Sequence, residues 1–154
     1  MRRLIAWTVV ALVFASSSSA TAAPTPNPCK VLKKTEIQRV FGGRVAAPSR
    51  NGGLCVWDIN GGLGHKNGGS LSAELDEGSG AADNYEGFAP AGEPVSGVGD
   101  KAFYGPSASS GFNVLKGDAY LRLSTSFNIL GSSPSEAALR KKLTKLAKIA
   151  VKRI

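Results

Sequence analysis

The stretch AYLRLSTSFNI, residues 119 to 129, carries the clearest β-strand pattern in the chain. Leu121, Leu123 and Phe127 alternate with polar residues, which are Arg122, Ser124, Ser126 and Asn128. Because successive side chains of a strand point to opposite faces, the alternation predicts a strand with one apolar face and one polar face. A strand of this kind needs partner strands beside it and an apolar layer over one face.

Residues on the N-terminal side of this stretch predict those partner strands. Gly117-Asp118 is a tight-turn signal after a predicted strand over residues 112–116, and another strand is predicted over residues 101–104. Earlier in the chain, residues 54–59 predict a strand, and the alternation of Leu71, Ala73 and Leu75 predicts a second one. The turn signals between these two, Asn60-Gly61 and Asn67-Gly68, favour a long hairpin connection.

Two helices are predicted before the 119–129 strand. The first has Thr35 as N-cap and Gln38 at the third helical position, and it is expected to end at Gly42-Gly43. The second covers residues 81–89 and ends before Pro90, with one side formed by Ala82, Tyr85 and Ala89.

A final helix follows the strand. Ser133 and Glu136 fit a capping box, with Pro134 at the first helical position. Apolar residues then recur at helical spacing, as Leu139, Leu143, Leu146, Ala147, Ala150 and Ile154. This stripe is expected to bury against the sheet. The prediction is one α+β domain over residues 29–154, an antiparallel β-sheet with helices packed on one face.

The N-terminus has the features of a secretory signal peptide over residues 1–22. Arg2 and Arg3 precede an apolar run over residues 4–15, and Ala20-Thr21-Ala22 fits an A-x-A cleavage site. The run is shorter than the roughly 20 apolar residues that cross a bilayer. No cysteine stands at the cleavage point, and a Pro-rich linker over residues 23–28 follows. We expect a secreted or periplasmic protein, soluble after cleavage, without a transmembrane segment and not a lipoprotein.

The two cysteines, Cys29 and Cys55, have three possible chemistries: a reactive thiol, a metal site or a disulfide. Zinc would need further ligands, and His65 is the only histidine. A separation of 26 positions does not fit the C-x-x-C spacing of a redox pair. In an exported chain, an even number of cysteines favours a disulfide. We therefore predict a structural Cys29–Cys55 bond.

Motifs for catalysis and cofactors are weak. Gly97 to Ala102 matches the letters G-x-G-x-x-A, but a predicted strand follows it rather than the helix that a dinucleotide site requires. His65 could serve as a base. Glu74, Asp76 and Glu77 cluster at the end of a strand, where Glu74 and Asp76 share a face and could hold a cation. Both groups are better explained as solvated surface. No catalytic residue, metal or cofactor is predicted. A small secreted hydrolase is the enzyme alternative.

Positive charge is concentrated in the predicted final helix. The whole chain has a formal net charge of +8, and residues 139–154 contain seven basic residues and no acidic one. Four of them recur at intervals of four, three and four, opposite the apolar stripe: Lys141, Lys145, Lys148 and Lys152. This face is a candidate for binding anionic lipid, envelope polysaccharide or another polyanion. The alternative is an ordinary solvated helix face. Nucleic acid is not an expected partner, because no aromatic residues interleave with the lysines.

Several motifs together resemble a known family. In chain order they are PCKVL at residues 28–32, Thr35-Glu36, Phe41-Gly42-Gly43, Cys55-Val56-Trp57 and PVSGVGDKAFY at residues 94–104. Their order resembles a domain of unknown function found in secreted proteins and lipoproteins of bacteria, common in actinobacteria. The resemblance implies a non-catalytic extracellular module for ligand sensing or envelope association, with a disulfide from the approach of the first helix to the first strand. This chain lacks the acylated cysteine of the lipoprotein members. The expected function is a binding or envelope-associated module of unknown ligand.

Overall fold

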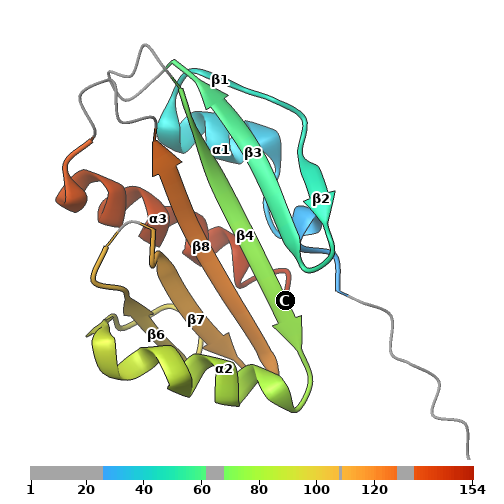
Figure 1. Ribbon diagram of the computed structural model, residues 1–154, viewed down its shortest axis with the longest axis vertical. Coiled ribbons are helices and arrows are strands. Elements are labelled where there is room, and N and C mark those ends of the chain that lie inside the picture. The colour runs from blue at the N-terminus through green and yellow to red at the C-terminus, as the bar shows by residue number, and fades with distance from the viewer. Residues whose placement is uncertain (1–25, 62–67, 108, 128–133) are drawn as a thin grey trace, which may run out of the picture.

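The computed structural model describes residues 26–61, 68–107, 109–127 and 134–154. Within them, an eight-stranded antiparallel sheet has the order β1-β3-β4-β8-β7-β6-β5, and β2 also pairs with β3 (Figure 1). The strands are β1 (Arg44–Val45), β2 (Ser49–Asn51), β3 (Leu54–Asn60), β4 (Gly69–Glu77), β5 (Glu93–Pro94), β6 (Lys101–Tyr104), β7 (Phe112–Lys116) and β8 (Ala119–Phe127). The helices are α1 (Lys34–Phe41), α2 (Gly80–Phe88) and α3 (Glu136–Ala150), with short 3-10 turns η1 (Pro28–Lys30) and η2 (Ala89–Ala91). The predicted α+β class is confirmed.

The strand predicted from residues 119–129 is β8, at the centre of the sheet. It pairs along its whole length with β4, from Gly69 opposite Phe127 to Glu77 opposite Ala119. The two-residue loop from β7 to β8 has Gly117 at φ 57°, the left-handed conformation that such hairpin loops favour. Residues 128 and 129 of the predicted strand lie outside the described residues.

Helices α1 and α3 pack side by side on one face of the sheet, behind it in the view of Figure 1. The predicted stripe of α3 is buried there, through Leu139, Leu143, Leu146, Ala147 and Ala150. Ile154 lies beyond the end of the helix and is half-buried against the same core. No helix among the described residues is long and apolar enough to cross a membrane.

Helix α2 packs on the opposite face, so the expectation of helices on one face holds for α1 and α3 and needs correction for α2 (Figure 1). The chain leaves β4 in the middle of the sheet and reaches the edge strand β5 through α2. The buried residues of α2 are Ala81 and Tyr85, whereas Ala82 is exposed. They pack against a small second apolar cluster formed by Phe103, Leu115 and Tyr120.

Two predicted helix starts also differ from the structure. Helix α1 begins at Lys34, with Lys33 as N-cap, because the Glu36 carboxylate accepts a hydrogen bond of 2.7 Å from the Lys33 N–H. Helix α3 begins at Glu136, because the Ser135 hydroxyl accepts from the Ala138 N–H at 3.3 Å. Ser135 therefore caps this helix, and Ser133 lies outside the described residues.

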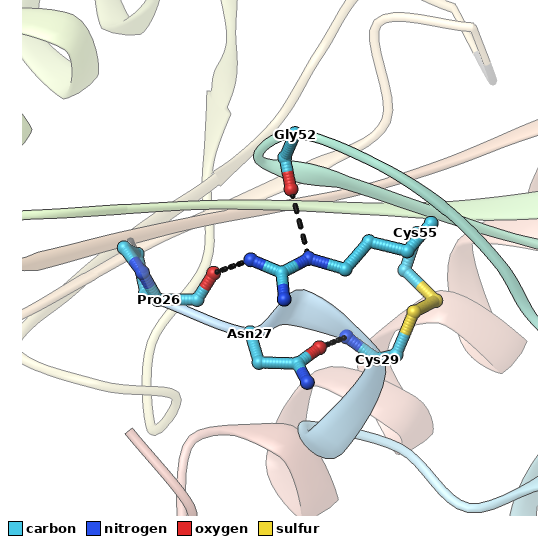
Figure 2. Close-up of a disulfide and its surroundings, with 6 residues drawn as sticks. Pro26, Asn27, Cys29, Gly52 and Cys55 are labelled. Carbon is cyan, nitrogen blue, oxygen red and sulfur yellow. Dashed lines mark hydrogen bonds between the residues drawn. A yellow bond between two sulfur atoms is a disulfide. The ribbon is translucent and has the colours of Figure 1, made fainter. Parts of the chain in front are cut away.

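The predicted disulfide joins Cys29 of η1 to Cys55 of β3, with 5.2 Å between their Cα atoms (Figure 2). Cys55 is fully buried. A further contact holds the N-terminal segment here, since the Arg50 guanidinium donates to the Pro26 carbonyl oxygen at 3.1 Å. The same guanidinium donates to the Gly52 carbonyl oxygen of the β2–β3 hairpin, also at 3.1 Å. Residues 26–28 of the Pro-rich segment are thus held against the β2–β3 hairpin, whereas residues 1–25 lie outside the described part of the chain.

The C-terminal residues are tied to α1 by an ion pair. The Arg153 guanidinium donates to the Glu36 carboxylate at 2.8 Å and also to the Val31 carbonyl at 2.8 Å. The Arg153 hydrogen bond, supported by the Lys33 N–H, lowers the pKa of Glu36 to about 2, although desolvation opposes this shift. Glu36 therefore joins the start of α1 to the segment after α3.

This ion pair predicts a stability loss in acid. Because the folded-state pKa of Glu36 lies below its ordinary value of 4.5, its contribution is present above that value and is lost as pH falls towards about 2. Chemical unfolding of the wild type and Glu36→Gln should therefore differ most near pH 6, and the difference should shrink towards about pH 2. Glu77→Gln, at an exposed carboxylate, is the control. A wild-type advantage over Glu36→Gln that is equal at both pH values would contradict the assignment.

Candidate functional site: a basic groove between α1 and α3

Three of the four predicted lysines form a line along the solvent side of α3. Lys141, Lys145 and Lys148 are exposed, while the opposite side of the same helix is buried in the core. We call these three residues the lysine ridge. Since the helix repeats every 3.6 residues, the intervals of four and three keep their side chains within one narrow sector.

A hollow of about 620 Å³ lies on the α1 side of the lysine ridge. We call it the α1–α3 groove. Helix α1 contributes Arg39 and Val40 to its lining. Helix α3 contributes the lysine ridge together with Ala138, Lys142 and Ile149. A second hollow, of about 410 Å³, lies against the ridge and is also lined by Ala137, Arg140 and Thr144. The same three lysines therefore line both hollows.

Lys142 has a structural role within the groove. Its ammonium donates a hydrogen bond to the Val40 carbonyl near the end of α1 and lies 5.7 Å from the centre of the Phe41 ring. Burial lowers the pKa of Lys142, and the charge of Lys145 lowers it further. A cation at this position also suits the negative end of the α1 dipole. Lys142 therefore joins α3 to the end of α1, next to Arg39.

The groove cations have no acidic partners in the part of the chain that the structure describes. Four ion pairs occur there, and they join Lys101 to Glu86, Arg122 to Glu74, Arg140 to Glu93 and Arg153 to Glu36. Arg39 and the lysine ridge take part in none of them, so no described carboxylate lies within 4.0 Å of their charged groups. Their charge faces solvent and the groove.

Lys152, the fourth predicted lysine, does not belong to this group. Helix α3 ends at Ala150, and Lys152 lies in the turn that follows. It is exposed and lines neither of the two hollows. The sequence-based prediction assumed that the helix continues to Ile154. Because the helix ends at Ala150, the helical spacing no longer places Lys152 beside the other lysines.

Arg39 is the α1 cation of the groove, and sequence reasoning did not predict it. It is exposed near the end of α1 and faces the lysine ridge across the groove. The hydrogen bond between Lys142 and Val40, which aligns the two helices here, spans 102 positions of sequence. No local pattern relates residues so far apart. The signal that the sequence did offer was a basic residue, Arg39, on another predicted helix.

A third hollow, of about 660 Å³, lies beside the start of α3, and its polar groups are paired with one another. The Tyr104 hydroxyl donates to Glu136 at 2.7 Å, and Arg140 lies 5.5 Å from the Tyr104 ring centre while it pairs with Glu93. Burial raises the pKa of Tyr104, and the Glu136 hydrogen bond raises it further. This network links β5, β6 and α3, and it neutralises Arg140.

The other sequence candidates lie away from these hollows. Glu74 forms an ion pair of 3.1 Å with Arg122, and Asp76 accepts a hydrogen bond of 3.0 Å from Asn84. Neither they nor the exposed Glu77 line any of the three hollows. Among the described residues no group of three or more His, Cys, Asp or Glu side chains could hold a metal ion. His65 lies outside the described residues.

The fold and groove together define an antiparallel α+β domain with a disulfide and a concave basic surface. Comparison of the chain with protein-family models, with curated proteins and with solved structures finds no match.

Proposed function

We propose that this protein is an exported, non-catalytic binding module that holds a polyanionic ligand at the α1–α3 groove. The observation that carries the proposal is the set of cations around it. Arg39 and the lysine ridge converge on one hollow, and no described carboxylate neutralises them. An anion that approaches this surface therefore meets several positive charges at once.

The electrostatics of the groove favour a ligand with several charges. Each exposed lysine interacts only weakly with a single anion in water, because solvent and salt screen the charge. A ligand that carries linked anions releases counterions at several positions in one binding event, so its affinity rises steeply with the number of contacts. The placement of the cations thus supports a polyanion more than a small monovalent ligand.

The expected location of the protein supports an envelope ligand. The N-terminal residues predict export, and the Cys29–Cys55 disulfide is compatible with an oxidising compartment. The resemblance to secreted bacterial modules points in the same direction. Polyanions at the outer surface of the producing cell are the ligands that such a module would meet first.

Removal of the lysine ridge tests this proposal. The triple variant Lys141→Gln, Lys145→Gln and Lys148→Gln should lower affinity for polyanions by at least about tenfold at roughly 50 mM salt, because three contacts between a lysine and an anionic group are lost. The slope of log affinity against log salt should also fall by about two to three. Equilibrium binding to a sulfated polysaccharide, measured at several salt concentrations, provides both quantities.

A charge-matched control separates the site from the overall charge. Lys30, Lys34 and Arg44 are exposed and do not line the groove, so their triple replacement by Gln removes the same charge elsewhere. Thermal stability should change little in either variant, since exposed charges contribute within about 0.5 kcal/mol. Equal losses of affinity in both triple variants would show that net charge, and not the groove, binds the ligand.

A further inference from the structure

We infer that the polyanion is a linear acidic polysaccharide that lies along the α1–α3 groove. This inference rests on the proposed function and narrows its ligand class. Three features of the groove carry it: the groove is concave, its lining includes aliphatic residues, and its cations come from both helices, as the lysine ridge on α3 and Arg39 on α1.

The concave shape disfavours a flat anionic surface as the ligand. The lysine ridge forms one side of the groove, and Arg39 on α1 forms the other. Val40 and Ile149 line the space between them and are half-buried. A planar bilayer would contact the ridge without reaching this floor. A narrow chain that lies in the groove can contact the floor, the lysine ridge and Arg39.

The floor has the chemistry that suits a sugar ring. Val40, Ala138 and Ile149 present aliphatic carbon between the charged groups. A sugar ring has C–H groups on its faces and, in an acidic polysaccharide, carboxylate or sulfate groups at its edge. The ring can therefore remove apolar area from water at the floor while its anions pair with the cations. A polyphosphate chain carries charge but has no apolar face to place there.

The spacing of the lysine ridge agrees with such a chain. At a rise of 1.5 Å per residue, Lys141 and Lys145 are about 6 Å apart along the helix axis, and Lys145 and Lys148 about 4.5 Å. These steps are similar to the length of one sugar residue in an extended chain. Successive acidic sugars can thus meet successive lysines without a large change of direction.

The apolar surface of the protein argues against insertion into a membrane at this face. Interfacial binding uses large apolar side chains beside the basic ones. Among the described residues the exposed large hydrophobic side chain is Phe88, which is 51% exposed. Phe88 belongs to α2, on the opposite face of the sheet from α1 and α3. The part of the basic face that the structure describes therefore has no large exposed apolar side chain to anchor it in a bilayer.

A variant that fills the groove and keeps every cation tests the inference. Ala138→Met places a longer apolar side chain at the floor in a residue type that favours helices. Affinity for polygalacturonate, a linear polymer of acidic sugars, should fall about tenfold, while affinity for phosphatidylglycerol vesicles stays unchanged. Ala82→Met, at an exposed position of α2, is the matched control and should alter neither affinity. Circular dichroism confirms that the variant folds. If Ala138→Met unfolds, Ile149→Thr replaces it, because it removes aliphatic carbon from the floor and should cause the same selective loss of affinity.

The outcomes separate the two proposals. Wild-type protein that binds neither polygalacturonate nor vesicles at low salt would overturn the proposed function itself. Two results would overturn the polysaccharide assignment and leave the polyanion site in place. One is a wild-type protein that binds vesicles as tightly as it binds polygalacturonate. The other is an Ala138→Met variant whose affinities for the two ligands fall equally or do not fall. We expect the wild type to bind vesicles more weakly than polygalacturonate. We expect Ala138→Met to lose affinity for polygalacturonate and to keep its affinity for vesicles.

Discussion

Replacement of Leu143 by alanine is expected to lower the free energy of unfolding by about 2 to 5 kcal/mol. Leu143 is fully buried in the layer between α3 and the sheet. Truncation to alanine removes apolar area from the core and leaves a cavity that the surrounding side chains fill only in part. Leu146→Ala should give a loss of the same order, because Leu146 is equally buried. Urea unfolding followed by circular dichroism measures both.

The same helix offers a control for this prediction. Lys145 is exposed on the opposite side of α3, so Lys145→Ala changes the side chain without touching the core. Its effect on unfolding should stay within about 0.5 kcal/mol. A loss below about 1 kcal/mol in both leucine variants would show that α3 does not pack on the sheet as described. Substitutions on the buried side of α3 should thus change stability, whereas substitutions in the lysine ridge should change ligand binding.

Loss of the Cys29–Cys55 disulfide is expected to cost roughly 3 to 4 kcal/mol, from the chain entropy of the loop that it closes. That loss is a large share of the stability of a domain of this size. Cys29→Ala and Cys55→Ala should both show it in urea unfolding under non-reducing conditions. Addition of a reductant should destabilise the wild type by a similar amount and leave both variants unchanged.

The two cysteine variants also test the packing around the bond. Cys55 is fully buried and Cys29 is only partly so, and therefore Cys55→Ala should lose the larger amount. Wild-type stability that does not respond to the reductant would contradict a structural role for the bond. Polyanion binding should persist in whatever fraction of each variant remains folded, because neither cysteine lines the α1–α3 groove.

Local periodicity predicted the central strands well. Strands β6 and β7 have the predicted bounds, and β8 begins at Ala119 as expected. These segments alternate or carry strong turn signals, so their own residues decide their conformation. The short edge strands β1, β2 and β5 were not predicted. Each has two or three residues, and their pairing depends on the neighbouring strand rather than on their own sequence.

Helix α2 shows where periodicity stops being sufficient. Its pattern allows either Ala81 or Ala82 to share a side with Tyr85, since residues three and four apart both lie on one face. The rotation that buries Ala81 is set by contact with Phe103 and Tyr120, which come from β6 and β8. The choice of sheet face for α2 likewise depends on this contact, because Phe103 and Tyr120 belong to an apolar cluster separate from the core that α1 and α3 cover.

The fold class, the disulfide and the lysine ridge could be predicted from the amino-acid sequence, because each depends on the type and spacing of residues along the chain. The sequence also placed the buried and exposed sides of α3, since both follow the helical repeat. Three features follow from packing instead: α2 covers the other face, Lys152 lies outside the lysine ridge, and Arg39 lies across the groove from it. The first depends on the contact of α2 with Phe103 and Tyr120, the second on where α3 ends and the third on how α1 and α3 pack together. Such packing relates residues that no local pattern connects.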